Sequence, residues 1–418
     1  MVRSRRGGLV LNQETAPARI EITRAKGKSS SRRKKTARRR LATVGLFSGV
    51  GGIELGLAEA GHGALLLCEV DPSASAVLRR RFSKVDIHDD VCTIDALPKE
   101  TELVVGGFPC QDLSQAGRTA GIEGARSGLV GQVFRLIERQ PVPWLVLENV
   151  PFMLQLSKGR ALDVIVTALE HHGYKWAYRV VDSRAFGLPQ RRRRVLIVAS
   201  LDDDPRRVLF ADEAGEPEPL DADGRACGFY WTEGIRGLGW AVDAVPTLKG
   251  GSTVGVPSPP GIWLPDGQIV TPHICDAERL QGFEVDWTKP AEDVGRASFR
   301  WKLVGNAVSV PVATWVGERL ASPGDFQIRN EEPVKPGRSW PNNAWNVGEG
   351  RFTSDLSEWP VRIPRPPLAE FLEFEPKPLS VRATVGFRER TKRGTLNFPK
   401  GFLDAVDRHL ARMKTKSK

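Results

Sequence analysis

The sequence has no long apolar run and few cysteines. No stretch approaches the roughly 18–20 apolar residues that a membrane span needs, and the charged N-terminus lacks the apolar core of a secretory signal. We therefore expect a cytoplasmic protein without membrane contacts. The five cysteines form no Cys-x-x-Cys pair and no Cys/His cluster, which argues against zinc and predicts no metal. In a reducing compartment we expect four of them to be buried free thiols.

Positive charge is concentrated at the N-terminus. The chain of 418 residues has a formal charge of +11, and residues 1–40 alone contain 14 Lys and Arg against two Glu. The rest of the chain is therefore close to neutral. Such a run is typical of a solvated, disordered arm, and it also suits attraction to nucleic-acid phosphates without sequence preference.

Apolar segments of two kinds alternate between residues 41 and 200. Segments that suit strands lie at residues 42–47, 65–69, 103–105, 145–147 and 194–199, and segments with helical spacing lie at residues 53–60, 71–82, 129–138 and 163–171. This alternation is typical of a parallel sheet covered on both faces.

The alternation stops near residue 201. Residues 201–290 are rich in Gly, Pro and Asp, which indicates an inserted, loop-rich domain. Helical spacing returns at residues 299–320. Residues 323–418 are rich in Pro, Trp and charge, with an amphipathic helix expected at residues 402–413.

A glycine-rich turn follows the first predicted strand. It reads Phe-Ser-Gly-Val-Gly-Gly over residues 47–52, and Glu69 ends the next strand. Glycines let a ligand approach the backbone, and an acid at that strand end can bind ribose hydroxyls. A nicotinamide site would require a third glycine where Glu54 stands. The turn therefore favours an adenosyl cofactor, with a plain structural turn as the alternative.

Cys110 follows another predicted strand, in Gly-Phe-Pro-Cys-Gln at residues 107–111. Ligands bind at the carboxyl ends of strands in open α/β sheets. A cysteine there can be a nucleophile if its pKa is lowered. Taken alone, it is more often a small buried side chain.

Two more polar segments accompany predicted strands. Glu148 is a carboxyl group beside an apolar run, and it can act as an acid if burial keeps it protonated. The alternative is a surface Glu that caps the next segment. In the run Gln-Arg-Arg-Arg-Arg at residues 190–194, Arg192 and Arg194 share one face of an extended segment. They form either a cationic pair at a reaction centre or part of a solvated basic turn.

The order and spacing of these segments resemble the bacterial DNA cytosine-5 methyltransferase family over residues 41–200 and 270–322. The match includes Arg-Leu-Gln-Gly-Phe at residues 279–283 and Gly-Asn-Ala-Val at residues 305–308. Gly45 departs from the family, which usually has Asp there, and this puts one cofactor-side hydrogen bond in doubt. The resemblance implies a Rossmann-like S-adenosylmethionine-dependent methyltransferase sheet. It also implies transfer of a methyl group from S-adenosyl-L-methionine to C5 of a flipped cytosine in duplex DNA.

The resemblance assigns roles to individual residues. Cys110 would attack cytosine C6, Glu148 would protonate N3, and Arg192 and Arg194 would favour the thiolate and hold the base and its phosphate. Residues expected to bind the cofactor are Phe47, Gly49, Gly51, Glu69, Asp90, Pro109 and Asn306. Residues expected to contact DNA are Gln111, Ser114, Gln190, Thr247 and Leu248, the last two as a Thr-Leu signature.

The predicted organisation has four parts. Residues 1–40 form the arm, residues 41–200 and 291–322 the catalytic domain, residues 201–290 the target-recognition domain, and residues 323–418 an extension without an assigned role. The segment 278–283 returns to the catalytic domain. We expect a monomer of a bacterium or phage that works at the nucleoid on double-stranded DNA. It would act either beside a cognate restriction endonuclease or as a solitary methylase.

Two other functions are compatible with the same fold. A tRNA-methylating branch of the family typically carries a Cys-Phe-Thr tripeptide and lacks a long loop-rich insert, whereas this chain lacks the tripeptide and has the insert. A catalytically silent DNA-binding regulator would have lost Cys110, Glu148 or the arginine pair, and all are present.

Overall fold

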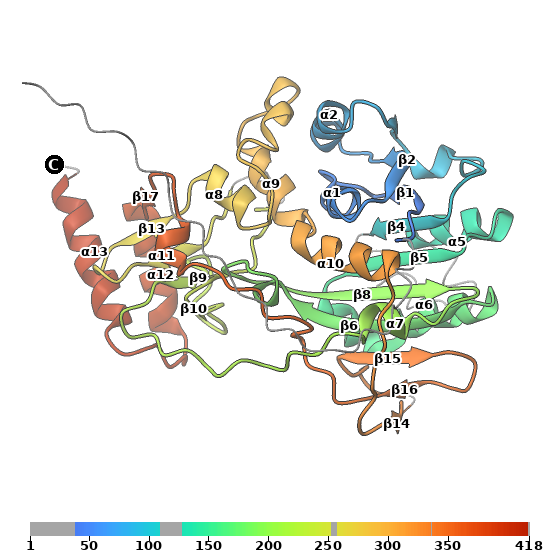
Figure 1. Cartoon of the computed structure of the whole chain (residues 1–418). Helices are drawn as coiled ribbons and strands as arrows, with labels where there is room; N and C mark the ends of the chain where they lie inside the picture. Colours follow the sequence, from blue (N-terminus) through green and yellow to red (C-terminus); the bar gives the residue numbers. More distant parts are fainter. Residues whose placement is uncertain (1–37, 109–127, 252–256, 336, 417–418) are drawn as a thin grey trace, which may run out of the picture. The chain divides into compact units, whose positions relative to one another are not determined.

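A ten-stranded sheet dominates the part of the chain that the computed structural model describes, residues 38–108, 128–251, 257–335 and 337–416 (Figure 1). Its order is β14-β16-β15-β6-β8-β5-β4-β1-β2-β3. The bounds are β1 Ala42–Leu46, β2 Gly63–Cys68, β3 Asp86–His88, β4 Leu103–Gly107, β5 Trp144–Asn149, β6 Lys175–Asp182, β8 Arg193–Ser200, β14 Glu332–Pro333, β15 Asn343–Asn346 and β16 Phe352–Thr353.

The half of the sheet from β3 to β5 is parallel. This confirms the predicted Rossmann-like arrangement. The carboxyl ends of parallel strands meet at one edge of a sheet, where ligands bind in this class of fold. The glycine turn after β1, Glu69 after β2 and the end of β5 therefore lie along the same edge.

The other half is antiparallel, which alternation alone did not predict. β8 pairs antiparallel with β5 and with β6, and β15 pairs antiparallel with β6. The connection between β6 and β8, residues 183–192, contains no crossover helix. A parallel connection needs a dozen or more residues, usually with a helix, so β8 turns back along β6.

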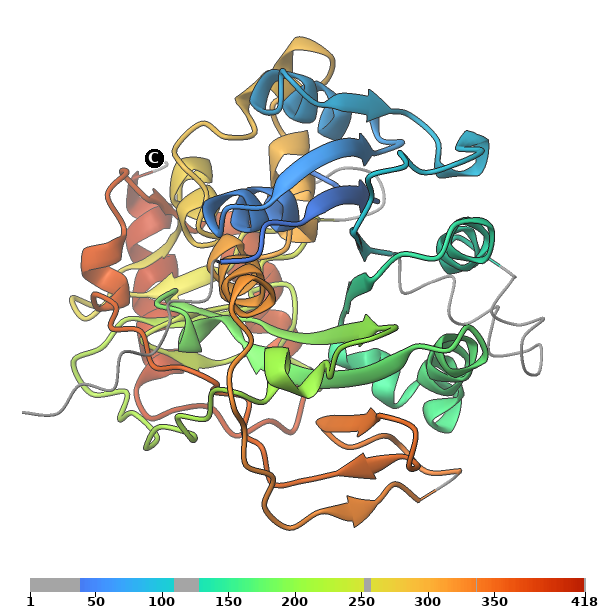
Figure 2. The same ribbon diagram turned by 45° about the vertical axis from the view of Figure 1, so that its right-hand side comes forward.

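Helices cover both faces of the sheet (Figure 2). On one face α5 and α6 pack into a core with Val44, Leu145 and Trp176. On the other face α1, α7 and α10 pack with Val105 and Val146. These helices are α1 Gly52–Glu59, α5 Val130–Arg139, α6 Arg160–His171, α7 Arg206–Leu209 and α10 Val310–Ala321. Three further helices are α2 Pro72–Arg81, α8 Ile274–Arg279 and α9 Phe299–Asn306.

A second sheet of five strands, β10-β9-β12-β13-β17, is antiparallel throughout. Most of it comes from the segment whose sequence suggested few regular elements. The bounds are β9 Cys227–Phe229, β10 Ala241–Val242, β12 Gly261–Trp263, β13 Ile269–Thr271 and β17 Lys377–Pro378. The shortness of these strands explains why no periodicity was visible. A two-stranded pairing of β7 Gln190–Arg191 with β11 Val245–Pro246 links this region to the large sheet.

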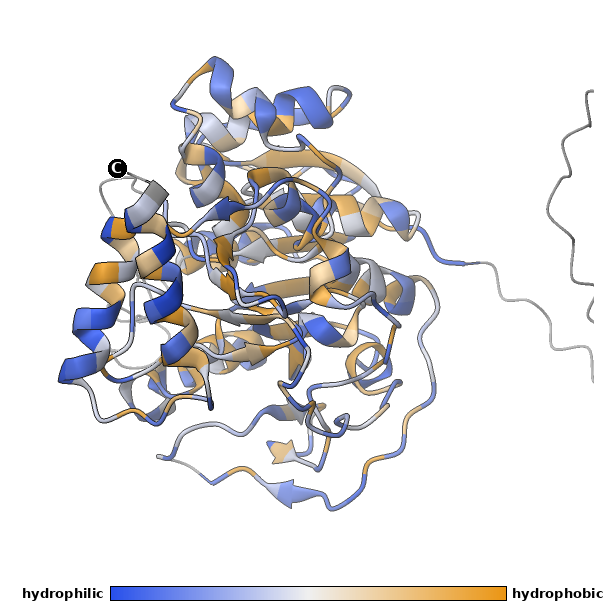
Figure 3. Ribbon diagram, turned by 90° about the vertical axis from the view of Figure 1, so that its left-hand side faces the viewer, coloured by the Kyte–Doolittle hydropathy of each residue, from blue (hydrophilic) through white to orange (hydrophobic). Residues whose placement is uncertain are grey.

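Residues 323–418 are divided between the two sheets. β14, β15 and β16 extend the large sheet, whereas β17 joins the small one. α12 Val381–Arg393 and α13 Phe402–Lys416 pack beside the small sheet around Phe229, Phe387 and Phe402. In Figure 3 both helices carry hydrophilic and hydrophobic residues, and their apolar residues Phe387, Phe402 and Val406 are buried in the core beside the small sheet. None of the described helices is long and apolar enough to cross a membrane.

Candidate active site

The carboxylate of Glu69 links the turn after β1 to the residues that follow β2. Gly49 N–H donates to Glu69 Oε2 and Asp71 N–H donates to Glu69 Oε1, each at 2.8 Å. Gly49 and Gly51 have positive φ angles of 56° and 83°, and Phe47 adopts 57°. Glycine adopts this conformation at little cost, whereas a side chain such as phenylalanine rarely does. Burial raises the pKa of Glu69, and the Asp71 and Gly49 N–H groups oppose that rise.

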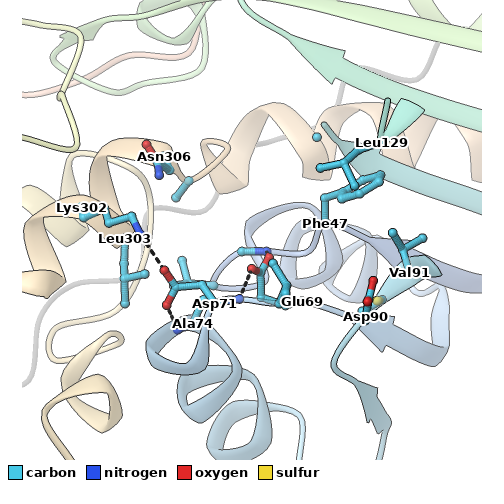
Figure 4. A pocket seen from close by; sticks show the side chains of 16 residues that line it. Phe47, Glu69, Asp71, Ala74, Asp90, Val91, Leu129, Lys302, Leu303 and Asn306 are labelled. Carbon is cyan, nitrogen blue, oxygen red and sulfur yellow. Dashed lines mark hydrogen bonds and ion pairs between the residues drawn. The ribbon is translucent and has the colours of Figure 1, made fainter. Parts of the chain in front are cut away.

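A cavity of about 370 Å³ opens beside this turn (Figure 4). Five of the predicted cofactor residues line it, namely Phe47, Gly49, Glu69, Asp90 and Asn306. The lining does not include Gly51, whose positive φ angle shapes the turn. Pro109 lies outside the described residues.

The cavity has further lining residues that the motifs did not identify, among them Val70, Asp71, Leu129 and Lys302. Val70 is 72% exposed. The apolar residue directly after Glu69 was the feature of the sequence that could have indicated this part of the cavity. Asp71 caps α2 by accepting from Ser73 N–H, and it also accepts from Lys302 Nζ at 2.6 Å. Burial opposes ionisation of Asp71, but Lys302 and the cap lower its pKa overall. This ion pair joins the start of α2 to α9 at the wall of the cavity.

Glu148 and Arg194 form a buried ion pair at the end of β5. Arg194 Nε lies 2.7 Å from Glu148 Oε1, and both side chains are about nine-tenths buried. Burial lowers the pKa of Arg194, and Glu148 opposes this effect. A Cβ built on Gly107 would lie 3.1 Å from Glu148 Oε2, and Gly107 also lines the cavity. Gly107 thus connects the ion pair with the cavity.

The segment that leads to Cys110 is anchored beside this pair. Asn149 Nδ2 donates to the carbonyl oxygen of Phe108 at 3.0 Å, and both residues are buried. Cys110, Gln111 and Ser114 lie outside the described residues.

Arg192 has different hydrogen-bond partners from Arg194. It is 0% exposed, and its guanidinium donates to the carbonyl oxygens of Leu248, Gly305 and Ala307. Burial lowers the pKa of Arg192 well below its usual value, and the charge of Arg194 adds to this effect. The head group therefore ties the loop after β11 to the end of α9, and no described acidic side chain pairs with it.

Three residues expected to contact DNA belong to the same junction. Gln190 is 0% exposed, accepts from Leu248 N–H and donates to the carbonyl oxygen of Leu280. Thr247 donates to the carbonyl oxygen of Arg191, and the side chain of Leu248 is buried. These contacts place Gln190 and Leu248 inside the junction, whereas Thr247 is half-buried.

The described cysteines differ in burial. Cys68, Cys227 and Cys275 are buried free thiols, whereas Cys92 is exposed, contrary to expectation. Cys275 lies beside Glu278 and Asp286, a set of atoms close enough together for a metal ion. However, Arg300 donates to both carboxylates, at 2.9 and 3.0 Å. An arginine already neutralises these oxygens, so the geometry is that of an ion-pair cluster.

The parallel half of the sheet, with a cavity at its carboxyl edge, defines a Rossmann-like fold. Residues 41–221 match the family model described as C-5 cytosine-specific DNA methylase. Type II methyltransferase M2.BsuMI of Bacillus subtilis (strain 168) is 47% identical over 385 residues, which cover 88% of this chain and 98% of that protein. The chain therefore belongs to the family of C-5 cytosine-specific DNA methylases. It is a DNA cytosine-5 methyltransferase, and enzymes of this family use S-adenosylmethionine.

Other similar proteins are more distant. Type II methyltransferase M.MspI of Moraxella sp is 29% identical over 301 residues, covering 66% of this chain and 70% of that protein. The crystal structure of S. pombe Dnmt2 methyltransferase has 17% sequence identity and a TM-score of 0.48, with coverage of 67% of this chain and 98% of that one.

Proposed function

We propose that Gly107, Glu148 and Arg194 mark the reaction centre, at which Cys110 attacks C6 of a cytosine turned out of duplex DNA. The observation that supports this most is the position of Gly107, which borders both the cavity and the Glu148 carboxylate. Cys110 follows Gly107 by three residues. A methyl donor in the cavity and a base beside Glu148 would then meet near this cysteine.

The chemistry assigned to the side chains begins with the Cys110 thiolate. Its attack forms the S–C6 bond, and N3 gains a proton from Glu148, so that electron density gathers at C5. Arg194 stabilises the carboxylate that Glu148 becomes, because the two groups are already paired and hold little water. The cofactor supplies the methyl group that C5 accepts. Loss of the C5 proton to a base then re-forms the C5–C6 double bond, breaks the S–C6 bond and releases Cys110, and N3 returns its proton to Glu148.

The cavity residues suit an adenosyl cofactor. Each oxygen of Glu69 accepts one backbone N–H, and a carboxylate oxygen can accept further bonds. Glu69 would therefore bind the ribose hydroxyls. The Phe47 ring would contact the adenosyl group, Asp90 would accept from the adenine amino group, and Asn306 would border the cofactor from α9.

The target base must leave the duplex, which costs a few kcal/mol. We propose that the five-stranded sheet and its loops read the DNA sequence. Lys249 lies in the loop after β11, over the ring of Tyr230, and forms an ion pair with Glu233. Because M2.BsuMI and M.MspI are named Type II methyltransferases, we also propose a role in restriction-modification.

The test begins by expressing the protein and mapping 5-methylcytosine in host DNA. A duplex with 5-fluorocytosine at the mapped position is then incubated with the protein and S-adenosylmethionine. Fluorine cannot leave C5 as a proton does, so a covalent protein–DNA adduct should accumulate. Cys110→Ser should form no adduct, whereas Cys92→Ser, which changes an exposed cysteine, should form it normally. An adduct with the Cys110→Ser protein would refute the mechanism, and methylation of tRNA instead of DNA would refute the substrate.

A further inference from the structure

Glu54 is a buried carboxyl group that the mechanism does not use. It lies in the first turn of α1 and is 2% exposed. Among the described residues, neither of its carboxyl oxygens makes a hydrogen bond of good geometry, and neither does the hydroxyl of Ser48. A buried polar group without such bonds is costly, so its presence beside the glycine turn requires an explanation.

The carboxyl group of Glu54 occupies the space over Gly45. A Cβ built on Gly45 would collide with Glu54 Oε1, and it would lie 2.7 Å from Ser48 Oγ and 2.9 Å from Leu67 Cδ2. Gly45 does not have a positive φ angle, so backbone conformation does not require glycine there. The glycine is required because Glu54 fills the position that a side chain from β1 would take.

The filled space adjoins the turn that holds Glu69. Ser48 N–H donates to the carbonyl oxygen of Cys68, and Gly51 N–H donates to that of Ser48. The Gly49 N–H between them donates to Glu69. Displacement of Ser48 would therefore disturb the Glu69 carboxylate, the side chain assigned to the ribose.

Glu54 suits this position in its uncharged form. Burial raises the pKa of Glu54 to about 7; contacts of the carboxyl group with its own backbone N–H and with the Ser48 hydroxyl oppose this rise, and the charge of Glu69 adds to it. A neutral carboxyl group can both donate and accept a hydrogen bond. It can therefore support a neighbouring hydroxyl such as that of Ser48 without adding a second negative charge beside Glu69.

We propose that Glu54 is a positioning residue for the cofactor. Its carboxyl group comes from α1, occupies the space that a side chain at Gly45 would fill, and stabilises the turn that orients Glu69. This inference rests on the proposed cofactor cavity. Glu54 lies on α1 and does not itself line that cavity.

The experiment measures S-adenosylmethionine binding by calorimetry on the full-length protein, with DNA binding measured separately. Glu54→Ala should weaken cofactor binding about tenfold or more and leave DNA binding within threefold. Glu54→Gln keeps the shape and the uncharged polar group, so its affinity should stay within threefold of the starting protein. Glu59→Ala is the matched control, because Glu59 lies on the same helix but is exposed and contacts Thr314.

A swap tests the shared space directly. Gly45→Asp alone should weaken cofactor binding because its side chain collides with Glu54. Gly45→Asp with Glu54→Ala should recover affinity to within about threefold, because the new carboxyl group enters from β1 and the ends of Ser48 and Leu67 can rotate. Additive losses in the double variant would overturn the proposal, as would a Glu54→Gln protein as weak as Glu54→Ala. If the unmodified protein binds no S-adenosylmethionine, the cofactor cavity itself is misassigned.

Discussion

Replacement of Arg192 by methionine tests whether this arginine holds neighbouring segments in position or acts on the reacting groups. Its guanidinium makes four N–H···O hydrogen bonds, from 2.5 to 3.4 Å, with three carbonyl oxygens inside the junction. A hydrogen bond to a charged group contributes roughly 1.5–3 kcal/mol, and a buried acceptor left unpaired costs about 1–3 kcal/mol. Since the loss of a charged residue also removes its desolvation cost, we expect a net loss of about 3–5 kcal/mol in the free energy of unfolding.

The measurement is urea denaturation of the full-length protein, combined with amide hydrogen exchange. Amides of residues 248–251 and 305–308 should exchange faster, because Arg192 joins these two segments. Arg193→Met is the matched control, since Arg193 is 44% exposed and pairs with Glu358. Glu358 is only 13% exposed but keeps a hydrogen bond from Asn342, so this variant should lose about 1–2 kcal/mol, less than Arg192→Met, and should leave exchange at residues 248–251 and 305–308 unchanged.

An Arg192→Met protein with an unchanged free energy of unfolding but no methyl transfer would refute the positioning role. If Arg192→Met loses methyl transfer at least a hundredfold while its free energy of unfolding changes by under about 1 kcal/mol, Arg192 acts on the reacting groups. Arg192→Lys should lie between the two results, because one ammonium group cannot span three carbonyls with the geometry of a guanidinium.

Three further predictions concern charge. Arg194→Met should destabilise the protein by about 3–5 kcal/mol because it leaves Glu148 buried without its partner, and the double variant with Glu148→Gln should cost less than the sum in a denaturation cycle. Burial raises the pKa of Glu54 from an ordinary 4.5 to about 7, so the folded state holds a proton that the unfolded chain releases above pH 4.5. The free energy of unfolding should therefore fall by about 3 kcal/mol as pH rises from 4.5 through 7, relative to Glu54→Gln measured under the same conditions; parallel curves would contradict this. Deletion of residues 1–40 should weaken DNA binding and flatten its salt dependence by about 0.9 in log–log slope for each phosphate that the arm neutralises in the full-length protein, and an unchanged slope would show that the arm is inert.

Much of the catalytic domain could be read from local patterns. The glycine turn, Glu69 and the strand before Cys110 were predictable because a parallel strand, its turn and the next helix follow one another in the chain. The positions of Phe47, Asp90 and Asn306 around one cavity followed from the family resemblance rather than from any periodicity. The antiparallel direction of β8 was not predictable in this way, because strand direction depends on how the intervening segment returns.

The sequence by itself determined the class of enzyme, because the groups that do the chemistry occur in short segments with a fixed order. Only the tertiary structure decided what individual polar side chains do within that order. Arg192 and Arg194 are two residues apart, yet one holds backbone carbonyls and the other pairs with Glu148. In the sequence Glu54 only interrupts a glycine pattern, but in the fold it fills the space over Gly45. Such partners are contributed by segments far apart in the chain, and their burial sets the energy of each interaction.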